Sequence, residues 1–472
     1  MNRYQKLLGN TMIFAIGTFS SKLLVFVMNH FYTAALTKPE YAVANIIILV
    51  SNIIIPVASL GIANAVIRYG VDQSNDRSEV FSISILTVLG GVMLLLPFYP
   101  LIGPVLQHFL PESEILPSYV VMIYLYVFVS SIQSVCSQFV RALGHVRLYA
   151  LDGVFRTVMT VVFNILFLSV WKIGIPGFVL SVVCSDGLTV IALCFIERLP
   201  RYFRPTAYRL ALAKSMYRYA APLIMTTICV WIFSSSDQFF ISWLTGEETA
   251  AIFIASYKIP TILTVVSGIF IEAWQLSTFT NNTYEEQVDF FSKVGNAYQA
   301  IIFMMASGVV MFSRIGMAII AVPSYFEGWR YIPLLIFATG FCCLSNFANS
   351  VYALYKKTIL SFVSAVGGAI ANLILNYVLI KRFGGNGAAF STLLCYIGMF
   401  LARAIHSRRY LEIRWKVGRF AGTFLLLCAQ SALALLYEGL FWYPIQLAMF
   451  LLICAANAQD ILLSIKKVLR RA

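Results

Sequence analysis

The sequence is short of charge, above all of negative charge. Only 11% of its 472 residues are charged, and 20 acidic residues stand against 34 Lys and Arg. Soluble domains carry roughly 25% charged and about 45–50% apolar residues, whereas 60% of this chain is hydrophobic. A globular core cannot hide that share, because its surface would still need polar cover. The scarcity of charge excludes a soluble protein and indicates one that lies within lipid.

The chain also lacks the residue clusters on which most enzymes depend. Its four His are scattered, and none joins Cys, Asp or Ser in the spacing of a zinc site or a nucleophilic triad. The nine Cys lie in apolar runs, which indicates small apolar fillers rather than disulfides. The sequence has no P-loop, and the predicted outer loops are short. We therefore expect transport rather than catalysis, with no metal and no cofactor.

Long apolar runs are what the sequence has instead. A membrane span needs about 20 mostly apolar residues, and its backbone must be satisfied within the segment, which forces helices. The run after Met1 is too long for a signal peptide and has no cleavage motif, so we expect a retained span. The sequence predicts an all-α integral membrane protein with 14 transmembrane helices, at about 8–36, 42–67, 80–106, 117–140, 149–171, 176–196, 217–244, 249–276, 291–312, 331–354, 359–380, 386–405, 418–437 and 443–465.

The distribution of Lys and Arg predicts the orientation of these helices. With a cytoplasmic N-terminus, 26 of the 34 basic residues fall in inner segments, 6 in outer segments, and the remaining two, Lys22 and Lys258, within spans. Basic residues favour the cytoplasmic side. The sequence therefore predicts that both termini are cytoplasmic in a bacterial inner membrane. The net charge of +14 then reflects topology and contact with anionic lipid, not nucleic acid.

The sequence repeats itself at an offset of about 208 residues. The segments 172–181 and 382–391 share a pattern of basic, apolar, Gly and Ser residues, and Leu36–Thr37 matches Leu244–Thr245. Six helices in each copy make the repeats parallel, related by a pseudo-two-fold axis along the membrane normal. The predicted organisation is an N-lobe at 1–197, a basic cytoplasmic linker at 198–216, a C-lobe at 217–407, and two extra helices with a basic tail at 408–472.

Polar residues inside the predicted spans mark candidate sites, because intramembrane charges usually face the protein interior or a wet cavity. Lys22 lies at mid-span on a stripe with Thr18 and Asn29, and it would suit an anionic head group or form an internal ion pair. Lys258 and Asp237 are expected in the outer half of adjacent helices, as a structural salt bridge or a charge gate.

Two further acids lie within predicted spans. Asp186 is expected to stand alone in helix 6, with Ser181 and Ser185 nearby, and it could equally be a satisfied buried acid. Glu272 is too far along helix 8 to pair with Lys258. Arg68 and Arg156 lie nearer the inner surface and are the second choice for a cationic contact.

The stretch from helix 7 to helix 8 resembles a known family. An Asp stands before an aromatic run, followed by a Gly-Glu-Glu turn, a Tyr-Lys-Ile-Pro segment and an Ala-Trp pair, at Asp237, 246–248, 257–260 and 273–274. The segments 141–144 and 383–389 fit the same pattern. Together they resemble the polysaccharide-transporter branch of the multidrug/oligosaccharidyl-lipid/polysaccharide exporter superfamily, the Wzx-type flippases. The stretch 32–38 departs from that family, because it lacks the Arg that members often carry there.

The resemblance implies movement of an undecaprenyl-diphosphate-linked oligosaccharide from the inner to the outer leaflet by alternating access through a cationic cavity. Other polysaccharide-assembly proteins are the expected partners. Candidate substrate-binding residues are Lys22, Asn29, Arg68, Arg156 and Lys258. Candidate gating or ion-coupling residues are Asp186, Asp237 and Glu272.

Three alternatives remain open from the sequence. A lipid II flippase would use the same architecture for a different head group. A cation-coupled multidrug exporter would depend on the intramembrane acids. A membrane glycosyltransferase or polymerase belongs to a different class, and a paired acid or a large outer loop would support it.

Overall fold

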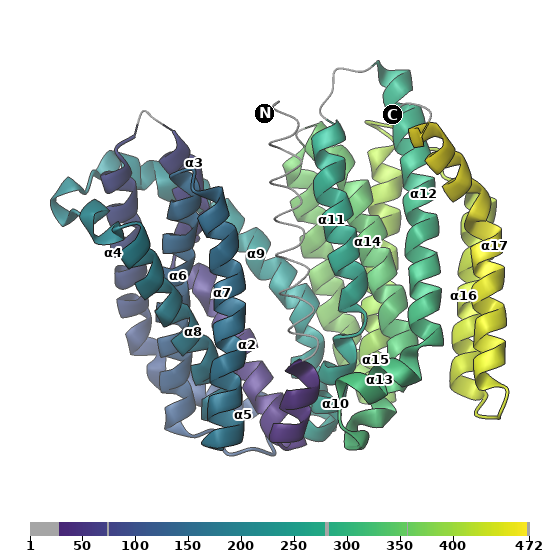
Figure 1. Cartoon of the computed structure of the whole chain (residues 1–472), viewed down its shortest axis with the longest axis horizontal. Helices are drawn as coiled ribbons and strands as arrows, with labels where there is room; N and C mark the ends of the chain where they lie inside the picture. Colours follow the sequence, from purple (N-terminus) through teal and green to yellow (C-terminus); the bar gives the residue numbers. More distant parts are fainter. Residues whose placement is uncertain (1–27, 73–74, 279–282, 356, 470–472) are drawn as a thin grey trace. The chain divides into compact units, whose positions relative to one another are not determined.

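The computed structural model of the chain describes residues 28–72, 75–278, 283–355 and 357–469. These residues form helices joined by short loops, and no strand occurs among them (Figure 1). The predicted all-α membrane fold is therefore confirmed. The chain divides into two compact units, Met1–Ala251 and Ile252–Ala472.

The first unit is built of helices that follow one another with short connections. Residues 28–35 are helical, and α2 begins with a capping box in which the Thr37 and Glu40 side chains satisfy free backbone N–H groups. The helices are α2 (Lys38–Ala58), α3 (Ile62–Val71), α4 (Arg77–Leu95), α5 (Tyr99–Phe109), α6 (Pro117–Ala142), α7 (Val146–Asn164), α8 (Ile175–Ile196) and α9 (Leu210–Thr245).

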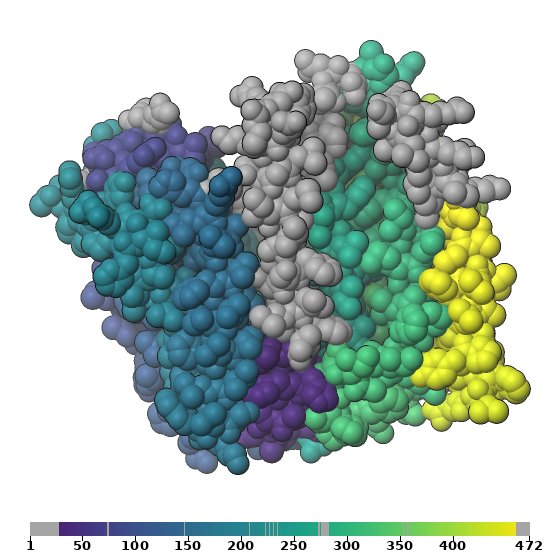
Figure 2. Space-filling model, in the orientation of Figure 1, coloured from purple at the N-terminus to yellow at the C-terminus, as the bar shows by residue number. Residues whose placement is uncertain are grey.

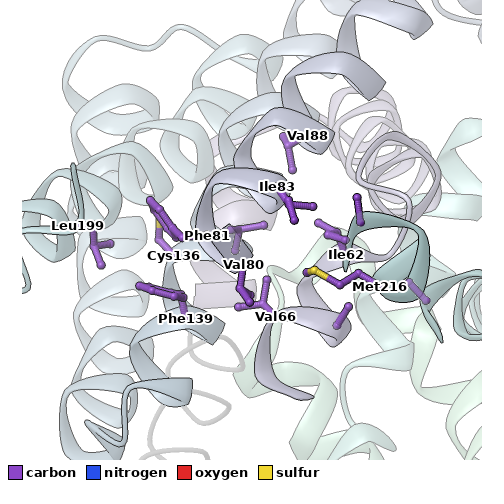
Figure 3. Close-up of a cluster of buried hydrophobic side chains, with 14 of the residues drawn as sticks. Ile62, Val66, Val80, Phe81, Ile83, Val88, Cys136, Phe139, Leu199 and Met216 are labelled. Carbon is purple, nitrogen blue, oxygen red and sulfur yellow. The ribbon is translucent and has the colours of Figure 1, made fainter. Parts of the chain in front are cut away.

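An apolar cluster holds one end of this unit together (Figure 3). Side chains of α3, α4, α6 and α9 meet there, and Leu199 of the 3₁₀ turn between α8 and α9 packs against them. Phe81 and Phe139 lie with ring centroids 4.6 Å apart at its centre. The cluster explains why the chain after α8 returns to the bundle, so that the 210–220 part of α9 packs with α3 and α4.

The second unit begins within a bent helix pair, α10 (Glu247–Tyr257) and α11 (Thr261–Thr278), whose axes differ by 40°. The pair coincides with the single span predicted at 249–276. The remaining helices are α12 (Tyr284–Met311), α13 (Ser313–Ile320), α14 (Ile332–Leu354), α15 (Thr358–Ser407), α16 (Val417–Leu436) and α17 (Trp442–Leu469).

Helix α15 spans 50 residues and consists of two helices joined at a break. Each part is longer than the roughly 20 residues that a membrane span needs. The break lies at Gly384, whose φ of 57° lies in the left-handed region that favours glycine. The break falls between the spans predicted at 359–380 and 386–405, and their number stays a prediction.

The last two helices form a pair at the edge of the second unit (Figure 2). Both pack against α12, where Ser307 and Gln430 share two hydrogen bonds of 2.7 and 3.1 Å. Within the pair, the Trp442 indole N–H donates to the Ala434 carbonyl at 3.0 Å. Buried amide and hydroxyl contacts of this kind hold transmembrane helices together where apolar packing gives little preference over lipid.

Ten described helices are long and apolar enough to cross a membrane, or eleven with the bent pair. Because the first predicted span lies mostly outside the described residues, the number fourteen stays a prediction. The lobes at 1–197 and 217–407, the linker and the 408–472 extension also stay predictions. The compact units divide later in the chain than the lobes do, since α9 packs on α2 and α3.

A close helix approach in the first unit gives a test of this packing. A Cβ at Gly91 in α4 would overlap the Ala58 carbonyl of α2, whereas a Cβ at the neighbouring Gly90 would meet nothing within 4 Å. Gly91→Ala is expected to destabilise the protein by about 1–3 kcal/mol, and Gly90→Ala is expected to be neutral or slightly stabilising. Melting temperatures of the two purified variants decide, and equal values would contradict the packing of α4 on α2.

Candidate functional site

The first unit contains an ion pair within its apolar bundle. Asp186 of α8 is fully buried, and its carboxylate pairs with the Arg156 guanidinium of α7. A second contact joins Arg156 Nη2 to Asp186 Oδ2 at 3.3 Å. Since a buried charge needs a counter-charge and hydrogen bonds, this pairing is what permits an arginine and an aspartate at this depth. The expectation that Asp186 stands alone was therefore wrong.

Hydroxyl groups complete the surroundings of the pair. The Ser130 hydroxyl of α6 donates to the Asp186 carboxylate. The Ser185 hydroxyl donates to the Arg156 backbone carbonyl at 2.6 Å and accepts from Thr160 at 2.9 Å. The site thus connects three helices by charge and hydrogen bonds, and it stabilises the interior of the first unit.

A second buried carboxylate lies one helical turn away. Asp152 of α7 is 5% exposed and accepts hydrogen bonds from the Ser137 hydroxyl and the Gln133 amide, both on α6. The same arginine, Arg156, acts electrostatically on Asp152 and on Asp186. Arg156 therefore forms its ion pair with Asp186 and acts on Asp152 at longer range. The sequence reasoning missed Asp152, although its spacing of four from Arg156 on one helix could have revealed it.

The other candidates of the first unit lie apart from this cluster. Asn29 is buried and its side-chain oxygen accepts from the Tyr41 hydroxyl at 2.7 Å. Arg68 is exposed on α3, with its guanidinium 4.8 Å from the centroid of the Tyr219 ring. Asp237 is buried in α9.

Three candidates are not brought into a site by the described residues. Lys22 lies outside them. Lys258 belongs to the second unit, whereas Asp237 belongs to the first, so their pairing stays a prediction. Glu272 lies on α11, and its role as a gating or ion-coupling residue also stays a prediction.

The second unit contains a buried arginine that is not among the predicted site residues. Arg403 of α15 is 4% exposed. Its Nε donates to Ser364 Oγ at 2.9 Å, and its Nη1 donates to Ser345 Oγ at 3.1 Å and to the Ser345 carbonyl at 3.3 Å. Among the described residues no carboxylate pairs with it. The signal was available, because Arg403 falls within the predicted span 386–405, but a run of basic residues follows it.

No cluster of three or more His, Cys, Asp or Glu with the geometry of a metal site occurs in the part of the chain that the structure describes. The nine Cys are free thiols.

The sequence pattern of a family described as polysaccharide biosynthesis protein matches residues 7–274. No protein of curated function matches the sequence.

Solved structures of similar fold belong to one superfamily. The lipid II flippase MurJ in an inward closed conformation is 12% identical, with a TM-score of 0.69 over 95% of this chain and 98% of that chain. An inward-facing multidrug resistance MATE family transporter of the MOP superfamily is 13% identical, with a TM-score of 0.66 over 84% and 98%. A MOP superfamily transporter from Pyrococcus furiosus is 13% identical, with a TM-score of 0.58 over 85% of this chain and 95% of that chain. The fold is that of MOP superfamily transporters, which confirms the resemblance inferred from the sequence.

The ion pair of the first unit gives a testable prediction. Asp186→Asn leaves Arg156 without its counter-ion, which costs about 3–5 kcal/mol for a fully buried pair. The expected loss is smaller, because the Arg156 side chain is 37% exposed. The double variant Arg156→Gln/Asp186→Asn should recover part of the loss, since it removes both charges. Asp152→Asn, which breaks no ion pair, is the matched control.

Melting temperatures of the purified, detergent-solubilised variants provide the measurement. A wild-type melting temperature in Asp186→Asn, or strictly additive losses in the double variant, would contradict the pairing.

Proposed function

We propose that this chain, a member of the polysaccharide biosynthesis protein family, moves an undecaprenyl-diphosphate-linked oligosaccharide from the inner to the outer leaflet. The chain belongs to that family because the family pattern covers more than half of it. Its many apolar helices and its fold make it a multi-pass membrane protein of the transporter type. The lipid-linked substrate and the direction of movement are the proposal.

The observation that carries the proposal is the extent of the structural likeness. The lipid II flippase is similar over 95% of this chain, whereas the MATE transporter is similar over 84%. The uncovered 5% is smaller than the α16–α17 pair, Val417–Leu469, so the flippase likeness includes at least part of that pair. A protein that moves a lipid-linked sugar therefore offers a fuller likeness than a drug exporter does.

The physical problem of such a substrate fits the chemistry of the chain. A sugar diphosphate cannot cross hydrocarbon unaided, because its hydroxyl groups would lose their hydrogen bonds and its charge would be desolvated. Cationic side chains within the membrane lower that free energy. Lys22, Arg68 and Lys258 remain candidates for this role. Arg156 is the weaker candidate, because Asp186 already neutralises it.

Alternating access is the mechanism we propose, with the lipid tail held outside the protein and the head group passing through a polar path. Asp237 and Glu272 remain candidates for gating or for coupling to an ion. No catalytic step is part of the proposal. We place the chain in a bacterial inner membrane with both termini cytoplasmic, since 26 of its 34 Lys and Arg then lie on the inner side.

A lipid II flippase is the second candidate, favoured by the same structural likeness. The two candidates differ in the saccharide and agree in the polyprenyl diphosphate. The family description favours the polysaccharide substrate.

Deletion of the gene tests the proposal. Cells without the chain are expected to lose surface polysaccharide and to accumulate undecaprenyl-diphosphate oligosaccharide, because synthesis on the inner face continues while delivery stops. Mass spectrometry of the lipid extract measures the intermediates, and re-expression of the wild-type chain is the control. Accumulation of lipid II instead would identify the second candidate. Unchanged pools of both lipids would show that the proposed function is wrong.

A further inference from the structure

Arg403 is a buried cation of the second unit, although it lies near the end of its helix, where a long side chain could extend towards water. It lies one turn before the end of α15 at Ser407, close enough for its side chain to reach the interface. Side chains of a helix lean toward its N-terminus, and Arg403 follows that direction into the bundle. Its hydrogen bonds go to Ser345 of α14 and to Ser364 in the first half of α15. The cation is thus held within the protein instead of reaching water.

The surroundings of Arg403 leave its charge uncompensated. The ionisable groups that act on it are Cys342, Tyr352 and Tyr396, and thiols and phenols are neutral at pH 7. Its hydrogen-bond acceptors are two hydroxyl groups and one carbonyl. An arginine remains charged in proteins. The partners described for Arg403 are therefore all neutral, in contrast to Arg156, which pairs with Asp186 in the first unit.

An accessible polar surface lies next to this cation. Most residues of α14 are buried, but Asn346 is exposed. Its amide donates to Cys342 Sγ at 3.8 Å. Asn349 lies one turn further along the same face, and its side-chain oxygen is buried without a hydrogen bond. Cys342, which Asn346 contacts, is also one of the groups that act on Arg403, so the exposed Asn346 lies near the buried cation.

We propose that Arg403, Ser345, Ser364 and Asn346 form a phosphate-binding site that holds the diphosphate of the lipid-linked substrate. The site offers a guanidinium, two hydroxyl groups and a carboxamide, all of which can donate hydrogen bonds. Phosphate oxygens only accept, and a guanidinium binds them with charge-assisted, often paired hydrogen bonds. The bound anion supplies a counter-charge for Arg403, whose described partners are neutral. This inference rests on the proposed function and adds the residues that bind the head group.

Binding of polyprenyl lipids to the purified full-length chain tests the site separately from transport. Native mass spectrometry in detergent measures binding of three probes: undecaprenyl diphosphate, undecaprenol and phosphatidylglycerol. Arg403→Gln is expected to weaken undecaprenyl diphosphate binding on the order of 10- to 100-fold, as loss of charged hydrogen bonds implies. Binding of undecaprenol, which has no phosphate, should be unchanged. Arg403→Lys should lie between, because lysine keeps the charge and loses the paired geometry.

Two further variants separate a binding role from a structural one. Arg408→Gln removes the same charge from an exposed position one turn later and should bind like wild type. Asn346→Asp changes an exposed side chain by one atom and places a negative charge beside the site, so it should weaken diphosphate binding without lowering the melting temperature. If Arg403→Gln does not fold, Asn346→Asp still tests the site, because its binding can be measured in a folded protein.

Three results would overturn the site. The first is wild-type affinity for undecaprenyl diphosphate in both Arg403→Gln and Asn346→Asp. The second is a loss of undecaprenol binding as large as the loss of undecaprenyl diphosphate binding. The third is an equally large loss of phosphatidylglycerol binding, which would show that the site binds the head groups of bulk lipid. Failure of the proposed function would give a different set of results. Unchanged lipid pools in the deletion strain, together with Arg403-dependent diphosphate binding, would leave the site standing and remove the flippase role.

Discussion

A charged side chain inside a membrane protein must find its counter-charge within a few ångströms, and this constraint organises both units. In the first unit the constraint is met within the chain, by Arg156 and Asp186 with hydroxyl groups from two helices around them. The pair draws α6, α7 and α8 together in the same region where hydrophobic packing has little preference between protein and lipid. The first unit is thereby stabilised by its own ionic contact.

The second unit meets the constraint in a different way. Arg403 donates hydrogen bonds to two serine hydroxyl groups, and its described partners carry no negative charge. Its hydrogen-bonding capacity is therefore used, while its positive charge is not neutralised by these partners. For a transporter of an anionic lipid this difference has a use, because a site that is already neutral gains less from binding a phosphate than a site with an excess cation.

Hydropathy predicted most of the fold, because lipid imposes a simple rule on length and on backbone hydrogen bonding. It placed the α10–α11 segment in one span and separated the two halves of α15, where Gly384 breaks the helix. The sites were predicted less well. Whether Asp186 meets Arg156 depends on how two helices are rotated about their axes, and a loose apolar pattern does not fix that rotation. Arg403 was missed although it lies in the span predicted at 386–405, because hydropathy marks a span and does not show which of its residues face the protein interior.

The central claim is that the substrate supplies the counter-charge of Arg403. A cryo-electron microscopy map of the full chain with undecaprenyl diphosphate tests this most directly. The account predicts phosphate density within hydrogen-bond distance of the Arg403 guanidinium, beside Ser345 and Asn346. Diphosphate density elsewhere in the protein, with Arg403 still bound only to its two serines, would contradict it.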